Sequence, residues 1–145
     1  MKKDKVFCFH HGWHFLLADE FPMQKALEKH KDKNGRCFYE LDYIEENWER
    51  VTLPHTFNDT DLFRDRIRDA GSGQKRTAVF YRNYLTVPKE YCGQKVLIEF
   101  EGIRQTCYLY VNGKMVGYVE NGVAPFGFDL TPFIDYDKPN LIAVA

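Results

Sequence analysis

Three observations predict an all-β fold of the jelly-roll or β-sandwich type. Short segments with strand-like hydrophobic patterns recur about every ten residues in the second half of the chain, with no long helical pattern between them. Aromatic residues make up 16% of the sequence, which favours strand packing. The pair Asn112-Gly113 lies between two of the strand-like segments, and Asn-Gly is the favoured filling of a two-residue hairpin turn.

The first strand is expected within "VFCFHHGWHFLLA", where aromatic and apolar residues have strand-like spacing. The polar segment 19–35 follows it. Apolar residues there are too few to define a buried face, so we expect a helical turn around Ala26 and Leu27 at most, within a solvated insertion.

The next segment, "RCFYELDYIEENWERVTLPHTFND", is predicted to contain a helical turn followed by a strand. Ile44 and Trp48 are four residues apart, a spacing that places two side chains on one helix face. An extended stretch from Val51 to Leu53 should follow, and Pro54 should end it.

The clearest strand alternation lies in "KVLIEFE". Val96, Ile98 and Phe100 should point to one side, and Glu99 and Glu101 to the other. The remaining strands are expected within residues 77–87, 108–118, 125–133 and 140–145.

The hairpin around Asn112-Gly113 has apolar residues on both faces. A two-residue turn fixes the register, and it predicts the pairs Val111–Lys114, Tyr110–Met115, Leu109–Val116 and Tyr108–Gly117. One face would then carry Cys107, Leu109, Val111, Val116 and Tyr118, and the other Tyr108, Tyr110, Met115 and Val119. Both faces therefore need a cover.

Composition indicates one domain, residues 1–145, and excludes several classes of partner. The formal net charge is -1, from 20 Lys and Arg against 21 Asp and Glu, so we expect neither a nucleic-acid nor a membrane partner. No apolar run reaches transmembrane length. No signal peptide is evident, which favours a cytoplasmic protein and leaves the periplasm open.

Metal and cofactor sites are not expected. The four cysteines form no C-x-x-C pair, and we expect them to be reduced thiols. His10, His11 and His14 lack a carboxylate or cysteine at ligand spacing, so they are interpreted as ordinary hydrogen-bonding residues.

Four motifs in order carry a resemblance to a known family. They are "NWERVTLPHTFND", "FYRNYLTVP", "KVLIEFEGIRQTCYLYVNGKMVGYVENGVAPFGFDLTPF" and "NLIAVA". Together they resemble the N-terminal sugar-binding domain of glycoside hydrolase family 2, which includes β-galactosidases, β-glucuronidases and β-mannosidases. The resemblance runs from about Trp13 to the end of the chain, and it implies a galactose-binding-like jelly roll.

The resemblance also implies a function. In this family the domain is followed by an immunoglobulin-like domain and a TIM barrel, and the barrel carries both catalytic glutamates. The chain would then be the N-terminal fragment of a larger glycosidase, with those domains and a carbohydrate as partners, and the exposed apolar patch of such a fragment would favour self-association. The alternative is a free-standing, lectin-like carbohydrate-binding module, and the glycoside itself is left open.

No catalytic residue is expected in the chain. Retaining glycoside hydrolysis needs two carboxyl groups about 5 Å apart. Glu99 and Glu101 share a strand face, but such positions lie roughly 7 Å apart and usually form a solvated surface.

The loop "PHTFNDTD" supplies the candidate substrate-binding residues His55, Asn58, Asp59 and Asp61. Sugar hydroxyls pair with amide and carboxylate groups, and a loop at a strand end is where ligand groups are usually mounted. In the family the matching loop lies on the side that faces the barrel. The alternative is an Asx-rich turn that satisfies its own backbone.

Overall fold

A computed structural model describes residues 4–56, 77–103, 106–120 and 124–145, and this part of the chain is mostly β-strand. The strands are β1 (Trp13–Leu17), β2 (Glu49–Val51), β3 (Val79–Thr86), β4 (Leu97–Phe100), β5 (Thr106–Val111), β6 (Lys114–Glu120), β7 (Phe126–Asp129) and β8 (Pro139–Val144). One short helix, α1 (Met23–Lys29), and a 3-10 turn, η1 (Lys89–Tyr91), accompany them. The predicted all-β class is confirmed. In the described residues, no helix has the length and apolar character needed to span a membrane.

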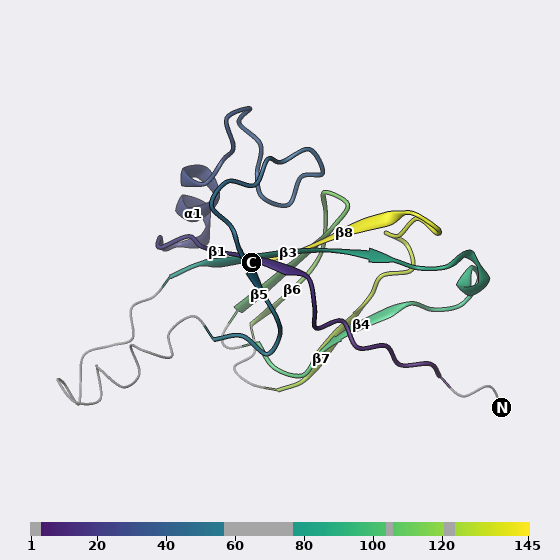
Figure 1. The fold of residues 1–145 in the computed structure, drawn as a ribbon. Coiled ribbons are helices and arrows are strands. Elements are labelled where there is room, and N and C mark those ends of the chain that lie inside the picture. Colours follow the sequence, from purple (N-terminus) through teal and green to yellow (C-terminus); the bar gives the residue numbers. More distant parts are fainter. Residues whose placement is uncertain (1–3, 57–76, 104–105, 121–123) are drawn as a thin grey trace.

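The strands form two antiparallel sheets. The large sheet has the order β2-β1-β3-β8-β5-β6, and the small sheet consists of β4 and β7. Figure 1 shows β4 and β7 below the large sheet, with α1 and the segment that follows it above. The large sheet is thus the middle layer of the described structure.

Both faces of the large sheet bury apolar side chains, because its central strands alternate between two cores. The inner core lies between the sheets and contains Trp13, Phe15, Val51, Val87, Cys107, Leu109, Val111, Leu130, Ile134, Ile142 and Val144. The outer core lies on the opposite face and contains Ala18, Ala26, Phe38, Ala78, Phe80, Tyr110, Leu141, Ala143 and Ala145. This is why segments such as β8 read as continuous apolar runs.

The outer face is covered by α1 and by residues 36–48, which we call the strap. Phe38 of the strap is 1% exposed and stacks on Phe80 with a centroid distance of 4.2 Å. The neighbouring Tyr39 stacks on Tyr110, also at 4.2 Å. The chain itself therefore covers part of the hairpin's second face.

The helical turn predicted around Ala26 and Leu27 is confirmed, since residues 19–35 contain α1. Most side chains of this segment are exposed or half-buried, as expected of a solvated insertion, but Ala26 is fully buried in the outer core. Ala26 is the one fully buried residue of this helix. A single small contact of this kind leaves almost no periodic signal in the sequence.

The helical turn predicted for Ile44 and Trp48 is wrong, since no helix is assigned there. The backbone N–H of Ile44 donates to the Asp32 carboxylate at 2.9 Å, which ties the strap to the loop after α1, whereas in a helix this N–H would donate to a carbonyl of the preceding turn. The strand after it is β2, which begins two residues before the expected Val51.

The hairpin register is right near the turn and wrong beyond it. Asn112 and Gly113 have positive φ values of 50° and 84°, as a type I′ turn requires, and the first two strand pairs are as predicted. A β-bulge then shifts the register by one residue. Leu109 lies opposite Gly117, and Tyr108 opposite Tyr118.

The bulge brings Gly117 close to the other sheet. A Cβ on Gly117 would be 2.3 Å from Cε1 of Phe128, a residue of β7. The glycine leaves room for this ring, and the bulge pairs it with Leu109. Tyr118 consequently moves from the predicted inner face to the outer face.

Candidate functional site

One end of the sandwich gathers the connections between strands. The registers place the start of β3, the end of β8, the start of β5 and the end of β6 at the same end of the large sheet. The end of β4 and the start of β7 pair through Phe100 and Phe126 and lead to this end as well. We call it the loop end, and in Figure 1 it lies on the left of the ribbon.

The described part of the loop end contains a surface groove of about 230 Å³. It is lined by Glu99, Phe100, Glu101, Pro125, Phe126 and Gly127, and the ring centroids of Phe100 and Phe126 are 5.3 Å apart. Both glutamates are exposed, whereas Phe100 is half-buried, which confirms the predicted alternation of β4. Aromatic residues beside solvated carboxylates suit a polar ligand with an apolar face.

His55 is the one predicted site residue that the structure describes. Its Nδ1 is hydrogen-bonded to the Tyr81 hydroxyl at 2.9 Å. The imidazole also packs against Phe15, with ring centroids 4.6 Å apart. His55 therefore contacts the edge of the inner core through Tyr81 and Phe15, and its contact with a sugar stays a prediction.

Burial supports the His55 anchor. Tyr81 lies against the inner core, and this burial raises the pKa of its phenol to about 12. The hydroxyl stays protonated at neutral pH, so the hydrogen bond to His55 is retained there. Asn58, Asp59 and Asp61 lie outside the described residues, and their role remains a prediction.

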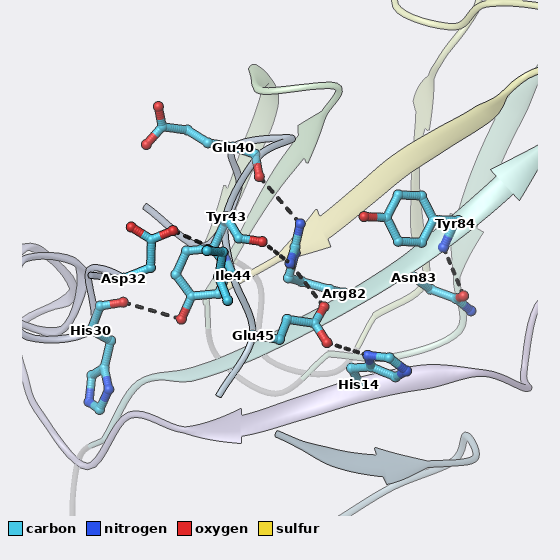
Figure 2. Close-up of polar contacts among 10 residues, drawn as sticks. All are labelled: His14, His30, Asp32, Glu40, Tyr43, Ile44, Glu45, Arg82, Asn83 and Tyr84. Carbon is cyan, nitrogen blue, oxygen red and sulfur yellow. Dashed lines mark hydrogen bonds and ion pairs between the residues drawn. The ribbon is translucent and has the colours of Figure 1, made fainter. Parts of the chain in front are cut away.

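A second polar cluster joins the strap to the sheet, and sequence reasoning missed it. Arg82 of β3 is 2% exposed, and its Nη1 donates to Glu45 Oε1 at 2.9 Å. Its Nη2 donates to the Glu40 carbonyl at 3.3 Å, and the other Glu45 oxygen contacts His14 (Figure 2). The guanidinium also lies 5.1 Å from the centroid of the Tyr43 ring.

The sequence did contain one signal for this cluster. Arg82 occupies a position in β3 where the alternation requires a buried side chain, and a buried arginine needs a partner. Which residue supplies the carboxylate was not readable, because Glu45 is 37 positions away. His14 is a hydrogen-bonding residue, as predicted.

Neither cluster is a metal centre. Among the described residues, no group of three or more His, Cys, Asp or Glu side chains is arranged to hold a metal ion. All four cysteines are free thiols. Burial raises the pKa of the Cys107 thiol to about 12, so this cysteine is an unreactive core residue.

The sequence matches a family model and several curated proteins. The family model described as "Glycosyl hydrolases family 2, sugar binding domain" matches residues 36–145. A β-glucuronidase of Formosa agariphila is 43% identical over 114 residues, which cover 77% of this chain and 12% of that protein. A β-galactosidase of Thermoanaerobacter pseudethanolicus is 39% identical over 73% of this chain and 14% of its own length. The chain thus spans about an eighth of the curated relatives that it matches.

Solved structures agree in fold. A β-glucuronidase from glycoside hydrolase family 2 superposes with a TM-score of 0.68 at 34% identity, over 94% of this chain and 13% of that one. A putative β-galactosidase from Bacteroides fragilis gives a TM-score of 0.66 at 26% identity, over 97% and 18% of the two chains. The family match begins at residue 36, later than the start near Trp13 that the motifs suggested.

Proposed function

This chain belongs to the sugar-binding domain family of glycosyl hydrolases family 2, and from that premise we propose that it serves a β-glycosidase as a non-catalytic domain whose loop end helps to form the sugar site. The observation that carries the proposal is the convergence of the loops and of the aromatic groove at one end of the sandwich. The relatives are named β-glucuronidases and β-galactosidases, so the substrate class is a β-glycoside. A free-standing lectin-like module is the less favoured alternative.

In this proposal some residues position the loop and others bind the sugar. His55 positions the loop through Tyr81 and Phe15. Asn58, Asp59 and Asp61 accept or donate hydrogen bonds to sugar hydroxyls, for which amide and carboxylate groups are suited. The catalytic carboxylates come from a TIM barrel elsewhere in the enzyme, with an immunoglobulin-like domain between the two.

The proposal can be tested by measuring the kinetics of a family 2 enzyme that contains this chain. Asn58→Ala and Asp59→Ala each leave a sugar hydroxyl unpaired, which costs about 1 to 3 kcal/mol, or roughly tenfold or more in kcat/KM. Asn34→Ala, in an exposed turn after α1, is the matched control and should leave kcat/KM unchanged.

Thermal unfolding of the same samples separates the two interpretations of the loop. If the loop is only an Asx-rich turn, Asn58→Ala and Asp59→Ala lower the melting temperature while the kinetics stay at the wild-type level. That result would remove the loop from the sugar site.

A further inference from the structure

The outer face of the β5–β6 hairpin carries exposed side chains at the border of the outer core, where Tyr108 packs against that core. Tyr108 and Tyr118 lie opposite each other in the ladder, with ring centroids 4.7 Å apart and a tilt of 46°. Tyr118 is 44% exposed, and Glu120, two residues further along β6, is exposed as well. Met115, on the same face, is 49% exposed.

The strap leaves this area open. Tyr39 covers the ring of Tyr110 by parallel stacking. Tyr108 is the next residue of β5 on the same face, and it is only half-buried. The strap therefore covers Tyr110 and leaves Tyr108 partly exposed.

The β-bulge puts Tyr118 on this face. In an unbroken register Tyr118 would share the inner face with Leu109, whereas the bulge pairs it with Tyr108 on the outside. Bulges redirect side chains and are over-represented next to functional sites. An aromatic residue is thereby kept out of the inner core and presented to solvent.

A carboxylate lies next to the ring pair. Tyr118 and Glu120 are two residues apart in β6, so their side chains share the outer face, and the Glu120 carboxylate raises the pKa of the Tyr118 phenol to about 12. In the described part of the chain, no Lys, Arg or His forms an ion pair with Glu120.

This combination suits one class of ligand. A pyranose ring has an apolar C–H face that packs against an aromatic ring, and hydroxyl groups at its edge that donate to a carboxylate. An apolar protein surface would bury the Glu120 carboxylate without a partner, which is costly. An anionic ligand would be repelled by the same carboxylate.

We propose that Tyr108, Tyr118 and Glu120 form an accessory binding site for a neutral pyranose on the outer face of the β5–β6 hairpin. The sugar ring stacks on the exposed side of Tyr118, and its hydroxyls donate to Glu120. This site goes beyond the proposed role of the loop end, since it lies on the sheet face that the strap shares.

NMR titration of the 145-residue chain with methyl β-D-galactopyranoside tests the site. The wild type should bind saturably, with shift changes at β5 and β6, and Tyr118→Ala should weaken binding by about tenfold or more. Tyr84→Ala is the matched control, because Tyr84 is 49% exposed on β3, and it should bind like the wild type. Tyr118→Phe, which keeps the ring, should retain most of the affinity.

Charge selectivity gives a second readout. Methyl β-D-glucuronide should bind more weakly than the galactoside, and Glu120→Gln should narrow that difference. The proposal would be overturned if the wild type showed no saturable binding, or if Tyr118→Ala and Tyr84→Ala bound the galactoside equally well. It would also be overturned if Tyr118→Ala changed only the oligomeric state of the chain and left its affinity for the sugar unchanged. Loss of binding in Asn58→Ala or Asp59→Ala but not in Tyr118→Ala would place the sugar at the loop end alone.

Discussion

Tyr118 shows how one inserted residue decides which side of a sheet a side chain occupies. The sequence pattern predicted Tyr118 on the inner face with Cys107, and the structure places it outside beside Tyr108. The register shift pairs Gly117 with Leu109, and Gly117 is the residue whose Cβ would overlap the ring of Phe128 in the other sheet. A register derived from a turn alone has no access to such a long-range contact.

Gly117→Ala is therefore expected to destabilise the chain. The new Cβ would overlap the Phe128 ring and force a shift, at a cost of about 1 to 3 kcal/mol in the free energy of unfolding. Urea unfolding measures this cost. In a Phe128→Leu background the same substitution should cost clearly less, and identical costs in both backgrounds would mean that the ring is not the obstacle.

Cys107 provides a residue-level test of burial through pH. Burial raises the pKa of its thiol from 9.0 to about 12, so the thiol ionises in the unfolded chain before it does so in the folded chain. Its contribution to stability is fully present below pH 9 and is lost as the pH rises towards 12. Between pH 9 and pH 12 the free energy of unfolding of the wild type should therefore fall relative to that of Cys107→Ala.

The control for this experiment is Cys92→Ala, since Cys92 is exposed. As an exposed substitution it should change the free energy of unfolding by no more than about 0.5 kcal/mol. A Cys107→Ala difference that stays constant between pH 9 and pH 12 would show that the Cys107 thiol is solvated.

At the scale of elements, the strap is the part of the fold that depends most on contacts between distant residues. Phe38 of the strap stacks on Phe80, and Glu45 accepts a hydrogen bond from Arg82. Both partners lie in β3. The strands themselves were predictable because their patterns are local: β4 alternates between exposed and half-buried residues, and β8 is a continuous apolar run. The strap and α1 have no comparable local pattern, so their cover of the sheet could not be predicted.

Glu45→Ala tests how the strap is held. Removing the carboxylate leaves the buried Arg82 guanidinium without its anionic partner, which costs about 3 to 5 kcal/mol in unfolding free energy. The neighbouring Glu46 is exposed, and Glu46→Ala should change stability by no more than about 0.5 kcal/mol. Equal effects of the two substitutions in chemical denaturation would contradict the anchoring role of Glu45.

The candidate site was predictable in its chemistry and not in its geometry. Residue types in "PHTFNDTD" pointed to hydrogen bonding with hydroxyls, and the position of the loop after a strand agreed with that. The anchoring of His55 on Tyr81 was not readable, because those residues are 26 positions apart and meet only through the sheet. For Asn58, Asp59 and Asp61 the sugar contact stays a prediction.

At the scale of the whole molecule, the large sheet is the layer that both cores share. The small sheet packs on one of its faces, and the strap covers part of the other. The loop end and the outer face of β5–β6 are the two regions where we propose ligand binding. Retaining hydrolysis needs two carboxyl groups about 5 Å apart within a substrate site. Glu99 and Glu101 are exposed beside the groove and are not expected to act as such a pair.

The central claim, that this is a non-catalytic sugar-binding domain, is tested most directly by incubating the pure 145-residue chain with nitrophenyl β-galactoside and nitrophenyl β-glucuronide. The account predicts no release of nitrophenol above the rate in buffer from either substrate. Release that is abolished by Glu99→Gln or Glu101→Gln would contradict it, because the chain would then carry its own catalytic carboxylates.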